Sequence, residues 1–181
     1  MEYPQLISTI ADVLFQLDAS KPVHKSFQPG IGLFGEPQLI KLLAEELRAL
    51  GMSARTQRTP DLSIGGDWAI EFKIVRPFGD NGKEAEDWSV NMLHPYPGNV
   101  SLIGDAIKLA GLGEYTIKCL FVIGFEHSPA KISLDPLLDS FEAICRDVMR
   151  IDLGKRIEEK RGLLVHPEHQ VLRCVGWQLA A

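Results

Sequence analysis

The chain has 181 residues, 45% of them hydrophobic, and a formal net charge of −5 at pH 7. This composition predicts one domain with a hydrophobic core, and no apolar run is long enough to cross a bilayer. The acidic balance disfavours a broad nucleic-acid-binding surface, which usually carries a basic excess, but it still permits a localised basic cleft. The three cysteines, Cys119, Cys145 and Cys174, lack CxxC spacing and indicate reduced core thiols in a cytoplasmic protein.

The first third of the chain alternates helical and extended patterns. Residues 4–17 carry apolar side chains at helical spacing, and residues 18–32 are rich in proline and glycine and predict a loop. A second helix is expected over residues 36–50, because Pro37 suits the first turn of a helix. A strand is expected at residues 53–57.

The segment 59–75 predicts a β-hairpin, because apolar and polar residues alternate on both sides of Gly65 and Gly66. A two-residue turn at these glycines would pair apolar positions with polar ones along the whole hairpin. A three-residue loop removes the mismatch, and loops of this length often use a glycine with positive φ. That register places Asp61 directly opposite Glu71.

Asp61 and Glu71 then form a pair of like charges, with β-carbons about 5 Å apart. Such a pair is destabilising unless positive charge compensates it. A divalent cation compensates best, and Lys73 faces the same way as Glu71 and adds a second positive charge. Mg²⁺ takes oxygen ligands from one or two carboxylates and keeps waters for a phosphate substrate. The hairpin is therefore expected to hold Mg²⁺ or Mn²⁺ against a phosphodiester.

Pro60-Asp61 followed by Glu71-Phe72-Lys73 resembles the PD-(D/E)xK motif of the restriction-endonuclease-like nuclease superfamily. The resemblance covers about residues 34–125 and implies an α/β fold, with a mixed central sheet flanked by helices. The core of that fold has the order αβββαβ. In this chain an extra terminal helix and extra strands would surround the core within a single domain, residues 1–181.

The resemblance also implies roles for individual residues. Asp61 and Glu71 would ligate the metal together with the main-chain carbonyl of Phe72, and Lys73 would hold the attacking water or neutralise the transition state. The alternative for Lys73 is a structural ion pair with Glu71. Glu36 matches an acidic residue that the superfamily often carries on the preceding helix. Its alternative role is to complement the dipole of that helix.

Residues 76–99 form a long irregular segment, and loops of this length in compact domains are usually functional or disordered. Under the resemblance this segment would lie beside the active cleft and touch the substrate. Arg76, Lys83 and His94 are the candidate contacts, although for each of them taken singly an ordinary solvated insertion is the favoured alternative.

A third helix is expected over residues 100–112. Its Lys108 would contact phosphate or, alternatively, pair with Asp105 on the helix surface. Residues 118–125 are almost continuously apolar, which is typical of a central strand covered on both faces.

A fourth helix is expected over residues 133–150, and closing strands or extended segments are expected at residues 163–165 and 171–179.

Two further motifs are set aside. The segment from Gly30 to Gly35 matches GxGxxG, but no strand precedes it, so a flexible turn is expected instead of a dinucleotide site. His166, Glu168 and His169 fit no standard zinc spacing and predict a solvated turn.

The sequence thus predicts a metal-dependent endonuclease with DNA as the expected substrate, and a homodimer if both strands of a duplex are cut. One alternative is a catalytically inactive module of the same fold that serves as a DNA-binding or protein-assembly domain. Another is an unrelated α/β protein, in which the carboxylate oxygens of Asp61 and Glu71 would not converge.

Overall fold

The computed structural model describes residues 1–20, 23–24, 28–78, 84–85, 88–96 and 100–180. The helices are α1 (Tyr3–Ala19), α2 (Glu36–Ala49), α3 (Trp88–Leu93), α4 (Leu102–Ala110) and α5 (Asp135–Ala143), with a 3₁₀ turn η1 (Ile31–Leu33) and a π-helical turn η2 (Ile144–Val148). The strands are β1 (Val23–His24), β2 (Gln28–Pro29), β3 (Ala54–Thr56), β4 (Leu62–Ile64), β5 (Trp68–Val75), β6 (Ile117–Glu126), β7 (Ile157–Gly162) and β8 (Val171–Gln178).

The fold is α/β, with a six-stranded mixed sheet in the order β3-β4-β5-β6-β8-β7. Strands β5 and β6 are parallel, and the other neighbours in this sheet are antiparallel. The expected succession of one helix, three strands, one helix and one strand is confirmed from α2 through β6, with α3 inserted before α4. None of the described helices is both long and apolar enough to cross a membrane.

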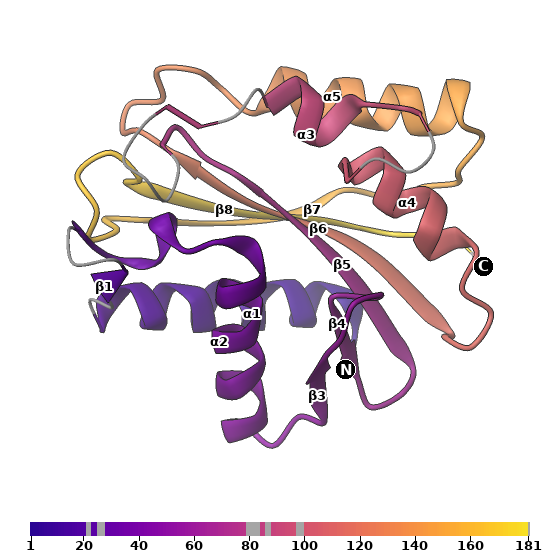
Figure 1. The fold of residues 1–181 in the computed structure, drawn as a ribbon, viewed down its shortest axis with the longest axis horizontal. Coiled ribbons are helices and arrows are strands. Elements are labelled where there is room, and N and C mark those ends of the chain that lie inside the picture. Colours follow the sequence, from indigo (N-terminus) through magenta and orange to yellow (C-terminus); the bar gives the residue numbers. More distant parts are fainter. Residues whose placement is uncertain (21–22, 25–27, 79–83, 86–87, 97–99, 181) are drawn as a thin grey trace.

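Helices cover both faces of the sheet (Figure 1). Helices α1 and α2 lie on one face, over a core that includes Leu62, Ile70 and Phe72. Helices α3, α4 and α5 lie on the other face, over a core that includes Ala69 and Val75. Consecutive residues of β5 thus enter different cores, because side chains alternate along a strand. The face of β5 that carries Ala69 and Val75 also carries Glu71 and Lys73.

The central position expected for β6 is confirmed. Phe121 and Ile123 enter the core under α1 and α2, whereas Leu120 and Val122 enter the core under the other helices. A strand buried on both faces needs apolar side chains at odd and even positions alike, which explains the continuous apolar run.

The register of the hairpin is also confirmed. Leu62 pairs with Ile70 and Ile64 pairs with Trp68. The three residues between β4 and β5 begin with Gly65 at φ +63° and Gly66 at φ +86°. Both values lie in the left-handed region that glycine adopts without a steric penalty.

Three sequence-based boundaries are wrong. The expected loop at residues 18–32 contains β1, β2 and η1, and the irregular segment 76–99 contains α3, which packs against α4 and α5. The first closing strand is β7 and not residues 163–165. Leu163 has φ +63° and is 96% exposed, so the chain turns there. An edge strand rich in charged residues, such as β7, lacks the apolar pattern by which strands are recognised.

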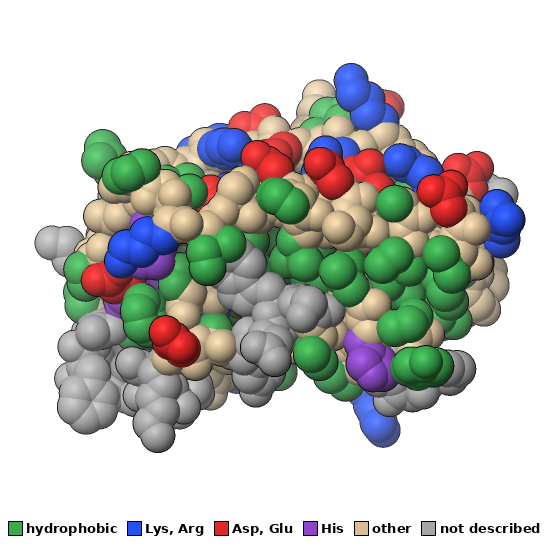
Figure 2. Space-filling model, turned by 90° about the horizontal axis from the view of Figure 1, so that it is seen from above, with side chains coloured by type: hydrophobic (Ala, Val, Ile, Leu, Met, Phe, Trp, Pro, Cys, Tyr) green, Lys and Arg blue, Asp and Glu red, His purple; other side chains and the backbone are tan. Residues whose placement is uncertain are grey.

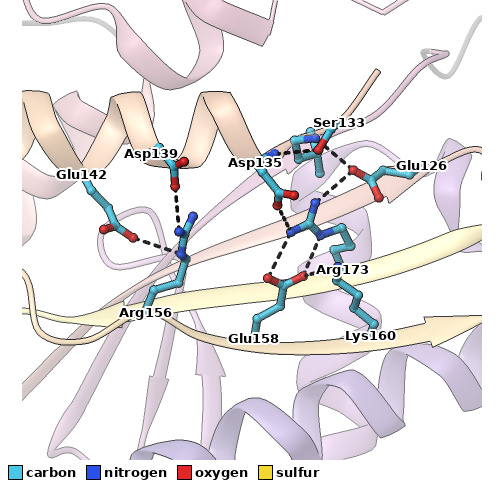
Figure 3. Close-up of polar contacts among 10 residues, drawn as sticks. Glu126, Ser133, Asp135, Asp139, Glu142, Arg156, Glu158, Lys160 and Arg173 are labelled. Carbon is cyan, nitrogen blue, oxygen red and sulfur yellow. Dashed lines mark hydrogen bonds and ion pairs between the residues drawn. The ribbon is translucent and has the colours of Figure 1, made fainter. Parts of the chain in front are cut away.

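Charged side chains of β7 form ion pairs with side chains of neighbouring elements (Figure 3). Glu158 accepts hydrogen bonds from Arg173 of β8, whose side chain is only 2% exposed. Arg173 also binds Glu126 of β6 and Asp135 of α5. Because three carboxylates surround this buried guanidinium, the network joins α5 to three strands of the sheet. A buried charged group is tolerated only when oppositely charged and hydrogen-bonding partners surround it.

The helix layer of α3, α4 and α5 also exposes apolar side chains beside charged ones (Figure 2). They include Val90 of α3, Ile107 of α4 and Val148 of η2. Scattered exposed apolar residues are normal on a protein surface, so this layer by itself indicates no function.

The expected solvated turn at His166 and His169 is wrong, because both imidazoles are buried, at 2% and 0% exposure. Their rings stack with centroids 4.4 Å apart, and burial lowers the pKa of His169 to about 3. A β-carbon on Gly32 would lie 2.2 Å from Nδ1 of His169, and one on Gly30 would lie 2.7 Å from Oδ1 of Asp18. Gly30 and Gly32 of the GxGxxG match therefore permit close packing against His169 and Asp18.

Replacement of Gly32 by alanine is expected to destabilise the fold by about 1–3 kcal/mol, because the new methyl group would overlap a buried imidazole. Thermal unfolding should show a melting temperature lower by roughly 2–4 °C per kcal/mol. Gly35→Ala is the matched control, since a β-carbon there meets only Oε1 of Gln38 at 3.6 Å. Equal melting temperatures for the two variants would contradict this packing.

Candidate active site

Two carboxylates lie along the edge of β5, next to the part of this strand that extends past the first residue of β4. Oδ2 of Asp61 accepts a hydrogen bond from the main-chain N–H of Phe72 at 2.9 Å. Oε2 of Glu36 accepts one from the N–H of Ile74 at 3.0 Å. The short β4 leaves these N–H groups without a strand partner, and the carboxylates satisfy them. Glu36, at the start of α2, is thus held against the motif strand.

Asp61 and Glu71 converge on one hollow, as the register requires, and each carboxyl group shifts the pKa of the other. Burial, the larger cause, and the neighbouring Asp61 carboxylate together raise the pKa of Glu71 to about 9. Burial also raises the pKa of Asp61, although the Phe72 N–H opposes this change. Without a cation, the pair therefore retains a proton on Glu71 at neutral pH.

Lys73 is 9% exposed and forms ion pairs with two carboxylates. Its Nζ lies 3.0 Å from Oδ2 of Asp105 and 3.5 Å from Oε1 of Glu36. Burial by itself would lower the pKa of Lys73, but Glu36 and Asp105 together raise it above its usual value. Lys73 is therefore a fixed positive charge. Its ion pairs lie with these two residues and not, as in the structural alternative, with Glu71.

Asp105 was not predicted as a site residue. It is only 3% exposed and also binds Nζ of Lys108 at 2.8 Å, so the expected surface pair is instead half-buried. Asp105 connects the lysine of the strand to a lysine on α4. A signal was present in the sequence: Leu102 and Leu109 lie three residues before and four after Asp105, which places it on the buried stripe of its helix.

These groups line one hollow of about 400 Å³. Its walls contain four carboxyl groups and three cationic side chains, together with two further residues. The residues are Glu36, Arg58, Thr59, Asp61, Glu71, Lys73, Val100, Asp105 and Lys108. Clustered ionisable groups with shifted pKa values in a concave site are typical of catalytic centres.

The chemistry of the Asp61–Glu71 pair fits a hard divalent cation. Oε1 of Glu71 is buried and has no hydrogen-bond partner among the described residues, so this oxygen is available to a ligand. The carbonyl of Phe72 faces the same strand edge as its N–H, next to Asp61. No group of three or more His, Cys, Asp or Glu side chains in the described ranges is arranged to hold a metal by itself. Two carboxylates plus a carbonyl and waters suit Mg²⁺, which seldom uses an all-protein cage.

The four substrate-contact candidates have different positions. Lys108 lines the hollow. Arg76 instead donates to two main-chain carbonyls in the segment before α2, at 2.8 and 2.6 Å. The ring of His94 contacts Tyr96 edge-on, with centroids 5.5 Å apart, and neither His94 nor Arg76 lines the hollow. Lys83 lies outside the described residues.

Two residues of the hollow, Arg58 and Thr59, were missed because they lie in an irregular segment between β3 and β4. Segments of this kind show no periodicity, so the direction of their side chains is set by tertiary contacts alone.

No protein-family model, curated protein or solved structure matches this chain. Its function must therefore be inferred from the chemistry of the hollow.

Proposed function

We propose that the protein is a metal-dependent nuclease with a restriction-endonuclease-like core that hydrolyses phosphodiester bonds of DNA. The observation that carries this proposal is the convergence of Asp61, Glu71 and Lys73 in one hollow, beside Glu36 and Asp105. The order of elements from α2 to β6 supports the same proposal, because it agrees with the αβββαβ core implied by the motif.

Asp61, Glu71 and the carbonyl of Phe72 would hold Mg²⁺ or Mn²⁺. When bound, such an ion lowers the pKa of a water ligand and offsets negative charge on the phosphate. To hold the cation, Glu71 would first release the proton that burial favours on its carboxyl group.

Lys73 would stabilise the negative charge that develops on the phosphate. A lysine held in the charged form cannot accept a proton, so it is an electrostatic group and not a general base. Glu36 and Asp105 hold its ammonium group from two sides and limit its movement. Lys108 is partly exposed at the rim of the hollow, where it would bind a phosphate oxygen.

The test is a cleavage assay on circular single-stranded DNA, supercoiled plasmid and RNA, in Mg²⁺, in Mn²⁺ and in EDTA. Cleavage of DNA in either metal and none in EDTA is the expected result. Metal-dependent cleavage of RNA alone would show that the substrate is RNA and not DNA. Binding of DNA without cleavage in any condition would replace the nuclease by a non-catalytic module of the same fold.

Asp105→Asn is expected to reduce the cleavage rate by roughly 10- to 100-fold, as for other residues that position a catalytic group. The amide keeps a hydrogen-bond acceptor beside Lys73 but loses the charge that raises the pKa of this lysine. The alkaline limb of the pH–rate profile should therefore shift to lower pH, which a purely structural role would not produce. Asp67→Asn, in the exposed hairpin loop, is the matched control. An unshifted alkaline limb in Asp105→Asn would exclude this positioning role.

A further inference from the structure

A second hollow adjoins the candidate active site. It has a volume of about 430 Å³ and lies between the start of α2 and the segment that follows β3. Asp61 and Arg58 line both hollows, so the two are adjacent. A strand whose phosphate lies beside Asp61 would extend directly into the second hollow.

The walls of the second hollow combine apolar and polar surfaces. Pro37 and Ile40 of α2 supply an apolar wall, and Thr56 and Gln57 supply polar groups. The side chain of Gln57 is held in place, because its Nε2 donates to the hydroxyl of Tyr115 at 2.7 Å. An apolar wall with hydrogen-bonding groups beside it suits a nucleobase, which presents a π-face and a polar rim.

Two cationic side chains line this hollow. Lys41 and Arg58 are exposed, and neither forms an ion pair with any residue in the described part of the chain. Asp61 also lines this hollow, but it forms no ion pair with Lys41 or Arg58, so both cations are available to bind an anion. Phosphate is the anion that a nucleic-acid strand would place there.

We propose that the second hollow binds one unpaired nucleotide next to the scissile phosphate, so that the substrate is single-stranded DNA. This inference rests on the proposed nuclease function. A base can enter this hollow only when it is unpaired and unstacked, because a paired base lies inside the duplex. Lys41 and Arg58 then bind the phosphates on either side of this nucleotide.

Binding is tested by fluorescence anisotropy in Ca²⁺, with gel analysis to confirm that the probes remain intact. The first probe is a labelled single strand of about 20 nucleotides, and the second is the same strand annealed to its complement. The third is an abasic strand with the same number of phosphates. Stacking of one base is worth about 1–3 kcal/mol, so the single strand should bind roughly tenfold tighter than either of the others. Arg58→Ala and Lys41→Ala should each weaken binding and reduce its salt dependence by about one unit of slope.

Arg55→Ala is the matched control. Arg55 lies on β3 but lines a different hollow, beside Ser63 and Tyr115. Its loss should therefore leave the preference for the single strand unchanged. Thr56→Trp, which fills the second hollow, should abolish that preference.

The outcomes separate this inference from the proposed function. Equal affinity for the duplex or the abasic chain would overturn the inference even if the protein cleaves DNA. Preferential binding of the single strand without cleavage would overturn the nuclease and retain the nucleotide site. Failure to bind any of the probes would overturn both.

Discussion

Asp61→Asn and Lys73→Gln are each expected to reduce metal-dependent DNA cleavage by at least about 10³-fold. The amide introduced by Asp61→Asn would still accept the hydrogen bond from the Phe72 N–H, but the substitution removes an anionic ligand from the metal site. The Lys73→Gln variant retains a hydrogen-bond donor near Asp105, but it has no charge to stabilise the phosphate. Initial cleavage rates measure the effect, and circular dichroism confirms that each variant is folded.

Two matched variants control for a general loss of charge. Asp67→Asn changes an exposed residue of the hairpin loop, and Lys160→Gln changes an exposed lysine of β7. Both are expected to cleave at the wild-type rate. If either site variant also cleaves at that rate, Asp61 and Lys73 do not perform the chemistry proposed for them.

Glu71→Gln is expected to stabilise the metal-free protein at alkaline pH and to abolish its response to Mg²⁺. The pKa of Glu71 is about 9 in the folded protein, against an ordinary value of 4.5. Between these values the unfolded chain releases a proton that the folded chain retains, so stability falls as pH rises. A single such group contributes at most about 1.4 kcal/mol per pH unit. Glutamine cannot ionise, so the variant loses this part of the pH dependence.

Denaturant unfolding in EDTA, from about pH 5 to about pH 9, measures the free energy of unfolding of both proteins across this window. The two curves should approach each other at acidic pH and diverge at alkaline pH. Added Mg²⁺ should raise the melting temperature of the wild type, because it binds the native state, and leave Glu71→Gln unchanged. The control is Glu45→Gln, on the exposed side of α2. Parallel pH curves for wild type and Glu71→Gln would show that Glu71 does not retain its proton.

The hairpin could be predicted from the sequence because its determinants are local. Strict alternation on both sides of two adjacent glycines permits only one register that keeps the apolar side chains on one face. That register also brings Asp61 and Glu71 together. The helix that begins at Glu36 follows from periodicity, and the central strand β6 follows from its continuous apolar run.

The contacts between segments that are distant in sequence could not be predicted from local patterns. Asp105 belongs to the site because α4 packs against β5 and carries this carboxylate to Lys73, a residue 32 positions earlier in the printed sequence. Arg76 was expected to touch substrate but binds carbonyls of the segment before α2. His166 and His169 were expected in solvent and are buried. A side chain's polarity does not reveal whether a partner from elsewhere in the chain will satisfy it.

The sequence alone determined that Asp61 and Glu71 face each other. Side chains alternate along a strand with a period of two, and the tight loop fixes the register of the hairpin. Only the tertiary structure decided which charges surround them. The electrostatics of the hollow depend on helices α2 and α4 docking at the hairpin, and docking is governed by packing between segments that are remote in sequence.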